Sequence, residues 1–445
     1  MNNARATIIL KYPVIPHVKH STPLWASNAS IYQVNVRQFS PSGTFKAVNT
    51  QLLRLKQLGV SIIWLMPIHE IGQVKRKGTL GSPYAVKDYY SINAELGTDA
   101  ELKELIEHAH ELELKVILDW VPNHSAWDNK LVTEHPHWYA RDYKGDFRPA
   151  PWWDWDDIIE FDYSQPDLRE YMIDAMSYWV RKFDVDGFRC DVAGYIPNDF
   201  WRQAREALDE IKPVFMLAEW ENRDLHEYAF DMTYAWSWNE VLHDIVHERA
   251  SLDKLRKYYS WNERAWPKEA MRMTFVSNHD ENAWEGTPSE KFGDAEHACI
   301  VLSCLGQGMP LIHNGQEAGE TKRLAFFEKD CIEWQEHSTG ALYTQLLSLR
   351  QRYTALWNAE HGALMHQVPN NHQQAIFSFV RQDSESKWFM IFNFSNEHKQ
   401  VSFKEDLFTD EYIDVFESSP CLHDLFADFE LDLEPWEYRI FMRKY

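Results

Sequence analysis

Hydrophobic and polar positions follow two alternating rhythms along most of the chain. Short apolar or β-branched runs, typical of buried strands, alternate with segments in which apolar residues return at helical spacing. Strand, helix and strand repeated in this way predict parallel strand pairing, with the helices outside. The predicted strands are Ile31–Phe39, Val60–Pro67, Lys115–Val121, Val185–Asp191, Val214–Trp220, Phe230–Trp236, Met271–Asn278 and Met309–Asn314.

The helical segments fall between these strands and after the last one. Eight strands favour a closed (β/α)₈ barrel over an open sheet, so the predicted fold class is α/β. The predicted helices are Val48–Leu58, Ala100–Leu112, Asp167–Phe183, Asn198–Ile211, Glu240–Tyr258, Asp294–Leu305 and Leu342–Tyr353.

Two regions depart from this rhythm. The stretch 124–166, after the third strand, is too long for an ordinary connection and rich in Trp, which predicts an inserted subdomain. After residue 357 the pattern has period two, with predicted strands Ala375–Val380, Lys387–Phe394 and Glu437–Met442. The predicted domains are therefore a barrel from 1–123 and 167–357, the subdomain 124–166, and an antiparallel β-sandwich domain from 358 to 445.

Composition and charge exclude some classes of binding partner and some cellular locations. The chain has 445 residues, 45 basic and 68 acidic, for a net charge of −23, which disfavours nucleic acid and anionic membranes. No apolar run is long enough to span a membrane, and the apolar run near the N-terminus is broken by Lys11, Pro13 and Pro16, so we expect no export. Five cysteines without paired spacing argue against disulfides and zinc, and predict a cytoplasmic protein.

Carboxylates follow several of the predicted strands at the same end. Side chains alternate along a strand, so Arg189 and Asp191 point the same way, and the guanidinium is expected to keep Asp191 ionised with a low pKa. Glu219 follows an apolar strand and precedes Trp220, and partial burial there raises a glutamate pKa, as a general acid needs. A structural ion pair at a strand end is the alternative for Arg189 and Asp191.

Two carboxylates of different protonation, with a third for support, are what glycoside hydrolysis through a covalent sugar ester requires. Phosphate chemistry would need a Gly-rich loop and acyl transfer a Ser/His pair, and the strand ends carry neither. The strand ends therefore favour glycoside chemistry.

The ordered strand ends resemble the conserved regions of the α-amylase family of glycoside hydrolases, family thirteen. The resemblance runs from about Ile31 to Tyr353 and implies the same barrel, insertion and C-terminal sandwich. The matching segments are Gly59–Pro67, Ser82-Pro83-Tyr84 with Asp88-Tyr89, Asp119–His124, Gly187–Asp191, Glu219-Trp220, Asn278-His279-Asp280 and Gly308–Glu317.

The resemblance also implies roles for individual residues. It makes Asp191 the nucleophile, Glu219 the acid/base, and Asp280 the carboxylate that grips and distorts the reacting sugar. The implied substrate-binding residues are Tyr84, which stacks on that sugar, His124, Arg189, which also holds Asp191, Trp220 and His279, and the implied supporting residues are Asp119 and Asn123.

One departure concerns metal. Many calcium-dependent members have a Lys-His pair soon after the nucleophile, whereas here Val192-Ala193-Gly194-Tyr195 follow Asp191. Asn123 matches another calcium ligand, but the usual cage lacks one. We therefore expect no required cofactor and no metal ligands. The valine after Asp191 resembles members that cut α-1,6 bonds, with ordinary strand packing as the alternative.

The predicted function is a cytoplasmic retaining α-glycosidase that hydrolyses α-glucosidic bonds of maltooligosaccharides or short α-glucans. One alternative keeps the site but transfers the glucosyl group, as transglycosylases, isomerases and phosphorylases of the family do. Another is a non-catalytic carbohydrate-binding homologue. Trp152, Trp153 and Trp155 are expected in the subdomain core rather than as sugar platforms. Linkage, endo or exo action and oligomeric state stay open.

Overall fold

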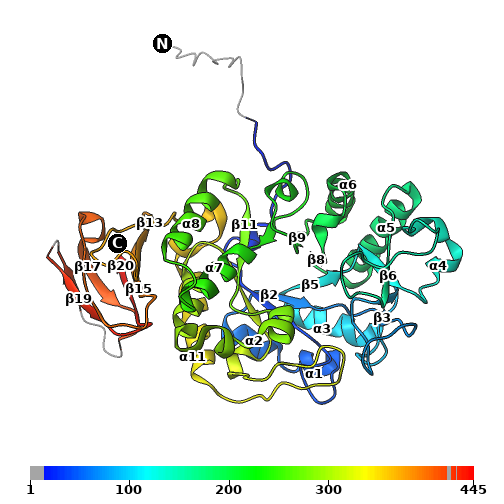
Figure 1. Cartoon of the computed structure of the whole chain (residues 1–445), viewed down its shortest axis with the longest axis horizontal. Helices are drawn as coiled ribbons and strands as arrows, with labels where there is room; N and C mark the ends of the chain where they lie inside the picture. The colour runs from blue at the N-terminus through cyan, green and yellow to red at the C-terminus, as the bar shows by residue number, and fades with distance from the viewer. Residues whose placement is uncertain (1–14, 418–421, 427) are drawn as a thin grey trace, which may run out of the picture.

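The computed structural model describes residues 15–417, 422–426 and 428–445, so much of the N-terminal segment judged for export lies outside them (Figure 1). Eight parallel strands close into a barrel in which each strand pairs with the next barrel strand along the chain, and β1 pairs with β12. The predicted (β/α)₈ barrel is therefore confirmed. Its strands are β1 (Ile31–Val34), β2 (Ile62–Leu65), β5 (Lys115–Trp120), β8 (Gly187–Cys190), β9 (Phe215–Ala218), β10 (Met232–Tyr234), β11 (Met271–Thr274) and β12 (Met309–His313).

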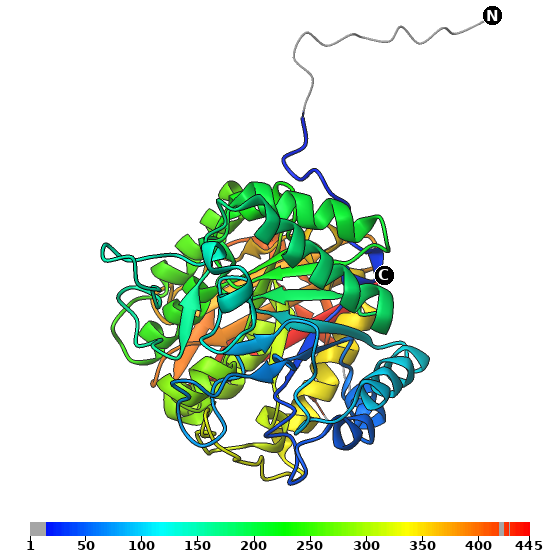
Figure 2. The ribbon, with the colours of Figure 1, turned by 90° about the vertical axis from the view of Figure 1, so that its right-hand side faces the viewer.

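Helices surround the barrel (Figure 2). The predicted single helix Glu240–Tyr258 is wrong, because the chain forms two helices there: Glu248 adopts a left-handed φ of 57°, which ends the first. The helices outside the insertion are α1 (Phe45–Asn49), α2 (Leu52–Leu58), α3 (Asp99–Glu111), α5 (Pro166–Phe183), α6 (Asn198–Asp209), α7 (Trp236–Val246), α8 (Asp253–Ala265), α9 (Pro288–Phe292), α10 (Glu296–Leu305) and α11 (Ser338–Arg352). Short 3₁₀ turns occupy 24–26, 136–138, 193–195, 223–226, 293–295, 316–318, 354–356, 359–361 and 406–408, and a π turn occupies 281–285.

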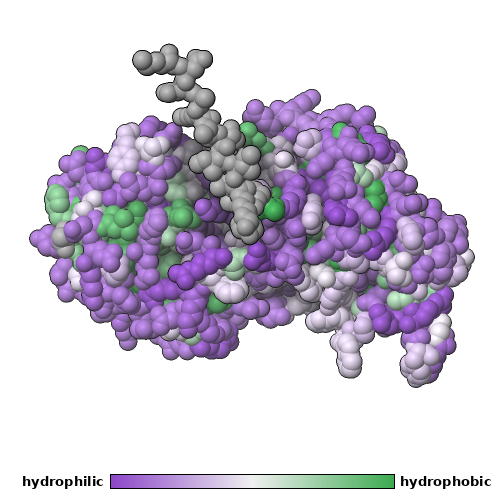
Figure 3. Space-filling view, turned by 90° about the horizontal axis from the view of Figure 1, so that it is seen from above, coloured by the Kyte–Doolittle hydropathy of each residue, from purple (hydrophilic) through white to green (hydrophobic). Residues whose placement is uncertain are grey.

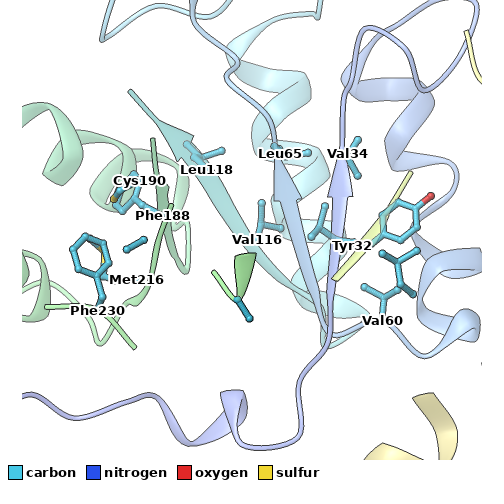
Figure 4. Packing of buried hydrophobic residues seen from close by; sticks show 14 of the residues in the cluster. Tyr32, Val34, Val60, Leu65, Val116, Leu118, Phe188, Cys190, Met216 and Phe230 are labelled. Atoms are coloured by element: carbon cyan, nitrogen blue, oxygen red, sulfur yellow. The ribbon is translucent and has the colours of Figure 1, made fainter. Parts of the chain in front are cut away.

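Alternation along the barrel strands separates two cores. On β5, Val116 and Leu118 point outward to the helices, as Figure 4 shows, whereas Ile117 belongs to the cluster inside the barrel. The same period on β9 puts Phe215 and Leu217 inside. Continued to the strand ends, this alternation directs Asp119, Arg189, Asp191 and Glu219 into the barrel mouth.

The region between β5 and α5 holds its own small elements. A two-stranded antiparallel sheet of β6 (His124–Ala126) and β7 (Ile158–Glu160) lies there with the short α4 (Leu131–Glu134). Beside it, the connection after β2 forms a second two-stranded sheet, β3 (Glu70–Ile71) with β4 (Val86–Asp88). Figure 1 places β3, β6 and α4 together at one end of the molecule. The boundaries at 123 and 166 stay a prediction.

The C-terminal strands form an antiparallel domain at the opposite end (Figure 1). A six-stranded sheet, in the order β13, β14, β15, β20, β17, β18, packs against the β16–β19 pair across a shared apolar cluster. Buried Arg381 joins this domain to the barrel by donating to the carbonyl of Leu305 at 2.8 Å. The strands are β13 (His366–Gln367), β14 (Ile376–Gln382), β15 (Ser386–Asn393), β16 (Lys399–Ser402), β17 (Asp410–Asp414), β18 (Leu422–Leu425), β19 (Glu430–Leu433) and β20 (Tyr438–Lys444).

The outer surface agrees with the charged composition. Figure 3 shows a mostly hydrophilic face with scattered hydrophobic residues. Within the described residues, no helix has the length and apolar character needed to cross a bilayer. The four cysteines in that part of the chain, Cys190, Cys299, Cys304 and Cys331, are free thiols.

Candidate active site

One buried guanidinium connects three carboxylates at the barrel mouth. Arg189 Nη1 lies 2.8 Å from Asp119 Oδ1 and 2.9 Å from Asp191 Oδ1, and Arg189 Nη2 lies 2.6 Å from Glu219 Oε1. Arg189 is 0 % exposed, so it sits beneath the carboxylates and contacts them rather than the surface of the cavity. The predicted ion pair between Arg189 and Asp191 is present, but Arg189 also contacts Asp119 and Glu219.

Strand pairing sets the positions of Asp191 and Glu219. Cys190 on β8 is in register with Ala218 on β9, and each catalytic candidate is the next residue along its strand. The ladder continues there, because the Glu219 amide donates to the Cys190 carbonyl at 3.0 Å. The Val192 amide then donates to Glu219 Oε2 at 2.8 Å from a backbone with a left-handed φ of 39°, an uncommon conformation for a β-branched residue. The Glu219 carboxyl is therefore held by the Arg189 guanidinium and by the Val192 amide.

Burial determines the protonation of this group of acids. It raises the pKa of Glu219 to about 8 and that of Asp191 to about 7, and the Arg189 charge opposes both shifts. The low pKa expected for Asp191 is therefore wrong, because loss of water outweighs the guanidinium. Both shifts have the same direction, so the two carboxyls together keep a proton to a higher pH than free carboxyls do.

Asp119, Tyr84 and His279 form a hydrogen-bonded chain beside this network. Tyr84 donates from its hydroxyl to Asp119 Oδ2 at 3.0 Å, and its oxygen lies 2.9 Å from His279 Nε2. Gln33 donates to His279 Nδ1 at 2.6 Å, so the imidazole carries its hydrogen on Nε2. Burial lowers the pKa of His279 well below the usual value, which keeps the ring neutral. His279 Nε2 also lies 3.3 Å from Asp280 Oδ2.

A cavity of about 500 Å³ opens over these residues. Six of the residues singled out by sequence lie on its wall: Tyr84, His124, Asp191, Glu219, His279 and Asp280. Sequence reasoning missed other wall residues, namely Lys77, Trp284, Phe326 and Phe327. The hydrophobic pattern of the sequence does not mark these residues, because they lie in the connections after barrel strands.

A second hollow of about 490 Å³ adjoins the first on the side of Glu219. Trp220, Tyr195 and Trp236 line it, and the two hollows share Glu219, Val192, Trp153 and Trp155. Tyr195 and Trp220 lie with their ring centres 5.1 Å apart. Trp220 therefore lies beside the acid candidate, outside the first cavity.

Two of the three tryptophans expected in the core of the insertion are exposed, whereas Trp155 packs against its apolar cluster. Trp152 is 100 % exposed and Trp153 is 56 % exposed. Trp153 and Trp155 stack with ring centres 5.5 Å apart and planes 16° from parallel. They stand at the junction of the two hollows, where stacked faces are available to a sugar, and the core interpretation is wrong for Trp152 and Trp153.

The expected calcium cage lacks a side-chain oxygen on the side that directly follows Asp191. Calcium takes six to eight oxygen ligands. The Asn123 amide points its nitrogen at His124 Nδ1, 3.2 Å away, and after Asp191 come Val192 and Ala193 without a side-chain oxygen. The Ala193 carbonyl accepts from the Trp201 indole at 3.0 Å. Elsewhere in the described part of the chain, His135, His137 and Asp167 could gather around a metal ion, but none lines the cavity.

Chelation is therefore expected to change little. Dialysis against EDTA should leave the melting temperature within experimental error of that of the untreated protein, because the side of the cage that follows Asp191 offers no side-chain oxygen and its Ala193 carbonyl is already hydrogen-bonded. Differential scanning calorimetry with and without added calcium measures this. A large drop in melting temperature that calcium alone restores would contradict it.

Comparison with known proteins identifies the family of this chain. The α-amylase catalytic-domain model matches residues 26–363. The chain is 26 % identical over 399 residues to α-amylase MalA of Haloarcula japonica, covering 86 % of this chain but 58 % of that protein, and 25 % identical to a cyclomaltodextrinase of a Bacillus species, covering 86 % and 76 %. It also resembles the structure of a noncanonic maltogenic α-amylase, AmyB, from Thermotoga neapolitana, with a TM-score of 0.86 and 31 % identity over 95 % of this chain and 100 % of that one. The chain belongs to the α-amylase family of glycoside hydrolases.

Proposed function

We propose that this protein is a cytoplasmic retaining α-glycosidase that hydrolyses α-glucosidic bonds of maltooligosaccharides or short α-glucans. The observation that carries the proposal is the Arg189 network, which brings Asp191 and Glu219 to matching positions on adjacent strands inside an aromatic cavity. Similarity to proteins named α-amylase, cyclomaltodextrinase and maltogenic α-amylase supports it.

The proposed chemistry requires an ionised Asp191 and a protonated Glu219. Ionised Asp191 attacks the anomeric carbon while Glu219 gives its proton to the departing glycosidic oxygen, leaving a sugar ester on Asp191. Glu219, now ionised, takes a proton from water as the water attacks the ester. Arg189 stabilises the carboxylates through both steps, since it contacts Asp191 and Glu219 together.

Binding groups surround the position of the reacting sugar. Tyr84 offers a flat ring, His124 and His279 offer ring nitrogens, and Asp280 accepts hydrogen bonds from sugar hydroxyls. Asp119 lies below this surface and fixes the Tyr84 hydroxyl. Asn123 acts one step further away, through its contact with His124.

The products are expected to keep the α configuration. Attack by Asp191 and then by water inverts the anomeric carbon twice. A retaining pair lies roughly 5 to 5.5 Å apart, against roughly 6.5 to 9.5 Å for an inverting pair. Neighbouring strands lie about 4.8 Å apart, and one guanidinium contacts both carboxyls here, which fits the shorter spacing. Proton NMR of the first-formed sugar tests this, and a β anomer appearing before mutarotation would overturn the nucleophile role.

Transfer to a second sugar is the other candidate that one observation favours. The aromatic hollow beside Glu219 is where a sugar could take the place of water as the acceptor. Incubation with maltoheptaose separates the two activities. Hydrolysis gives only shorter chains, whereas transfer also gives chains longer than the starting substrate.

A further inference from the structure

The two hollows correspond to the two sides of the bond that is cut. Because Glu219 protonates the leaving oxygen, the leaving sugar extends into the hollow lined by Glu219, Trp220 and Tyr195. The part that becomes attached to Asp191, the glycone, extends the other way, past Tyr84. That end of the first cavity is lined by Lys77, Phe326 and Phe327, which are absent from the second hollow.

The floor of the glycone end is short. Tyr84, His279 and Phe326 present nearly parallel rings: Phe326 lies 6.2 Å from Tyr84 at 8° and 6.1 Å from His279 at 25°. This floor offers one ring for the reacting sugar and one more for its neighbour. Phe327 comes next, with its ring centre 5.1 Å from that of Phe326 and nearly perpendicular to it. A perpendicular ring ends the stacking surface.

Two loops are joined directly beyond this floor. The Leu80 amide donates to the Phe327 carbonyl at 3.0 Å, and the Thr79 amide donates to Glu328 Oε1 at 2.9 Å. The approach is so close that a Cβ on Gly78 would lie 2.5 Å from Phe327 Cβ. The connection after β2 and the connection after β12 therefore form one continuous wall.

Lys77 extends this wall to the inserted region. Its ammonium donates to the Asp154 carbonyl and lies 3.6 Å from Asp154 Oδ1 and 3.6 Å from Asp156 Oδ1. It also lies 4.0 Å from Asp157 Oδ1, in a carboxylate that is almost fully buried. Although Asp154 and Asp156 are exposed, the backbone contact and the three acids hold one lysine from the β2 connection against the insertion.

We propose that these contacts close the glycone end of the cleft, so that the enzyme acts from the non-reducing end of an α-glucan and releases a glycone of one or two glucose units. This inference rests on the proposed function. The opposite hollow, lined by Trp220, Tyr195 and Trp236, is the more open of the two, so the remaining chain can extend through it.

A substrate with a blocked end tests the proposal. The two probes are a 4-nitrophenyl maltoheptaoside with a free non-reducing end and the same compound carrying a 4,6-ethylidene group there. Since one extra methylene in a filled pocket changes rates by about 10- to 200-fold, the blocked compound should react at least about tenfold more slowly. Chromatography of the products from the free compound should give glucose or maltose first.

Lys77→Met should reduce this discrimination and give longer glycone products, because it removes the charge that holds the bridge while keeping an unbranched side chain. Lys87→Met is the matched control: Lys87 is in the same connection, but its ammonium pairs with Glu70 of that connection, 2.6 Å from Glu70 Oε1, and does not line the cavity. An unchanged ratio in Lys77→Met would overturn the role of the bridge. Equal rates on both probes in the unmodified enzyme would overturn the closed end while leaving the proposed hydrolysis intact, and no reaction with either probe would overturn both.

Discussion

Glu219→Gln and Asp191→Asn are each expected to lower kcat on maltooligosaccharides by at least about a thousandfold. A positioned acid or base contributes about 10² to 10⁴ in rate, and Asp191 supplies in addition the attacking oxygen. Both substitutions keep the size of the side chain, so the Arg189 contacts lose charge without opening a cavity. Steady-state kinetics on maltoheptaose, with circular dichroism as the check of folding, measures the effect. Near-normal turnover in either variant would exclude the role assigned to that residue.

A second substrate separates the two roles. Fluoride leaves without a proton, so α-maltosyl fluoride should give a rapid burst of fluoride from Glu219→Gln, followed by slow turnover because the water-activating base is missing. Asp191→Asn should give no burst, since the ester cannot form. Glu296→Gln is the matched control: burial raises the pKa of Glu296 to about 7, but this residue is on α10 and does not line the cavity. It should keep its activity.

The sequence was sufficient for the parts of the site that depend on strand period. Alternation along β5, β8 and β9 predicts that Asp119, Arg189 and Glu219 face inward once the strands close into a barrel, and the ends of parallel strands then meet at one rim. The order of these residues along the chain is enough for that conclusion.

Other features depend on contacts that no local pattern encodes. The pKa of Asp191 is raised because the whole network is buried, and burial is a property of the closed cavity rather than of residues 189 and 191. The exposed positions of Trp152 and Trp153 depend on how the insertion folds over the barrel, and apolar character alone favoured the core. The wall formed by Leu80 and Phe327 joins residues 247 positions apart, counted from their numbers. The helix break at Glu248 came without a Gly or Pro to mark it.

Arg189→Ala is expected to lower kcat/KM by at least about a hundredfold and to destabilise the fold. Breaking a buried ion pair costs about 3 to 5 kcal/mol, and here one cation is shared by three acids. A displacement of about 1 Å at a reacting group can cost about a hundredfold in rate. Arg189→Lys keeps the charge, but its single ammonium cannot match both edges of the guanidinium, so its loss should be intermediate. Thermal unfolding and kinetics on the folded fraction measure these effects.

The pH profile distinguishes this role from a purely structural one. Arg189 lowers the pKa of Asp191 against the larger effect of burial, so its removal raises that pKa further. Activity needs ionised Asp191 and is lost as pH falls through its pKa; the acidic limb of kcat/KM should therefore move to higher pH in Arg189→Ala. Arg205→Ala is the control, because Arg205 is equally buried and lies 2.7 Å from Asp209 and 3.1 Å from Asp231, outside the cavity. Arg205→Ala should lower the stability of the fold and leave the acidic limb of kcat/KM unchanged. An acidic limb that stays fixed in Arg189→Ala would show that Arg189 holds the fold and does not control the charge of Asp191.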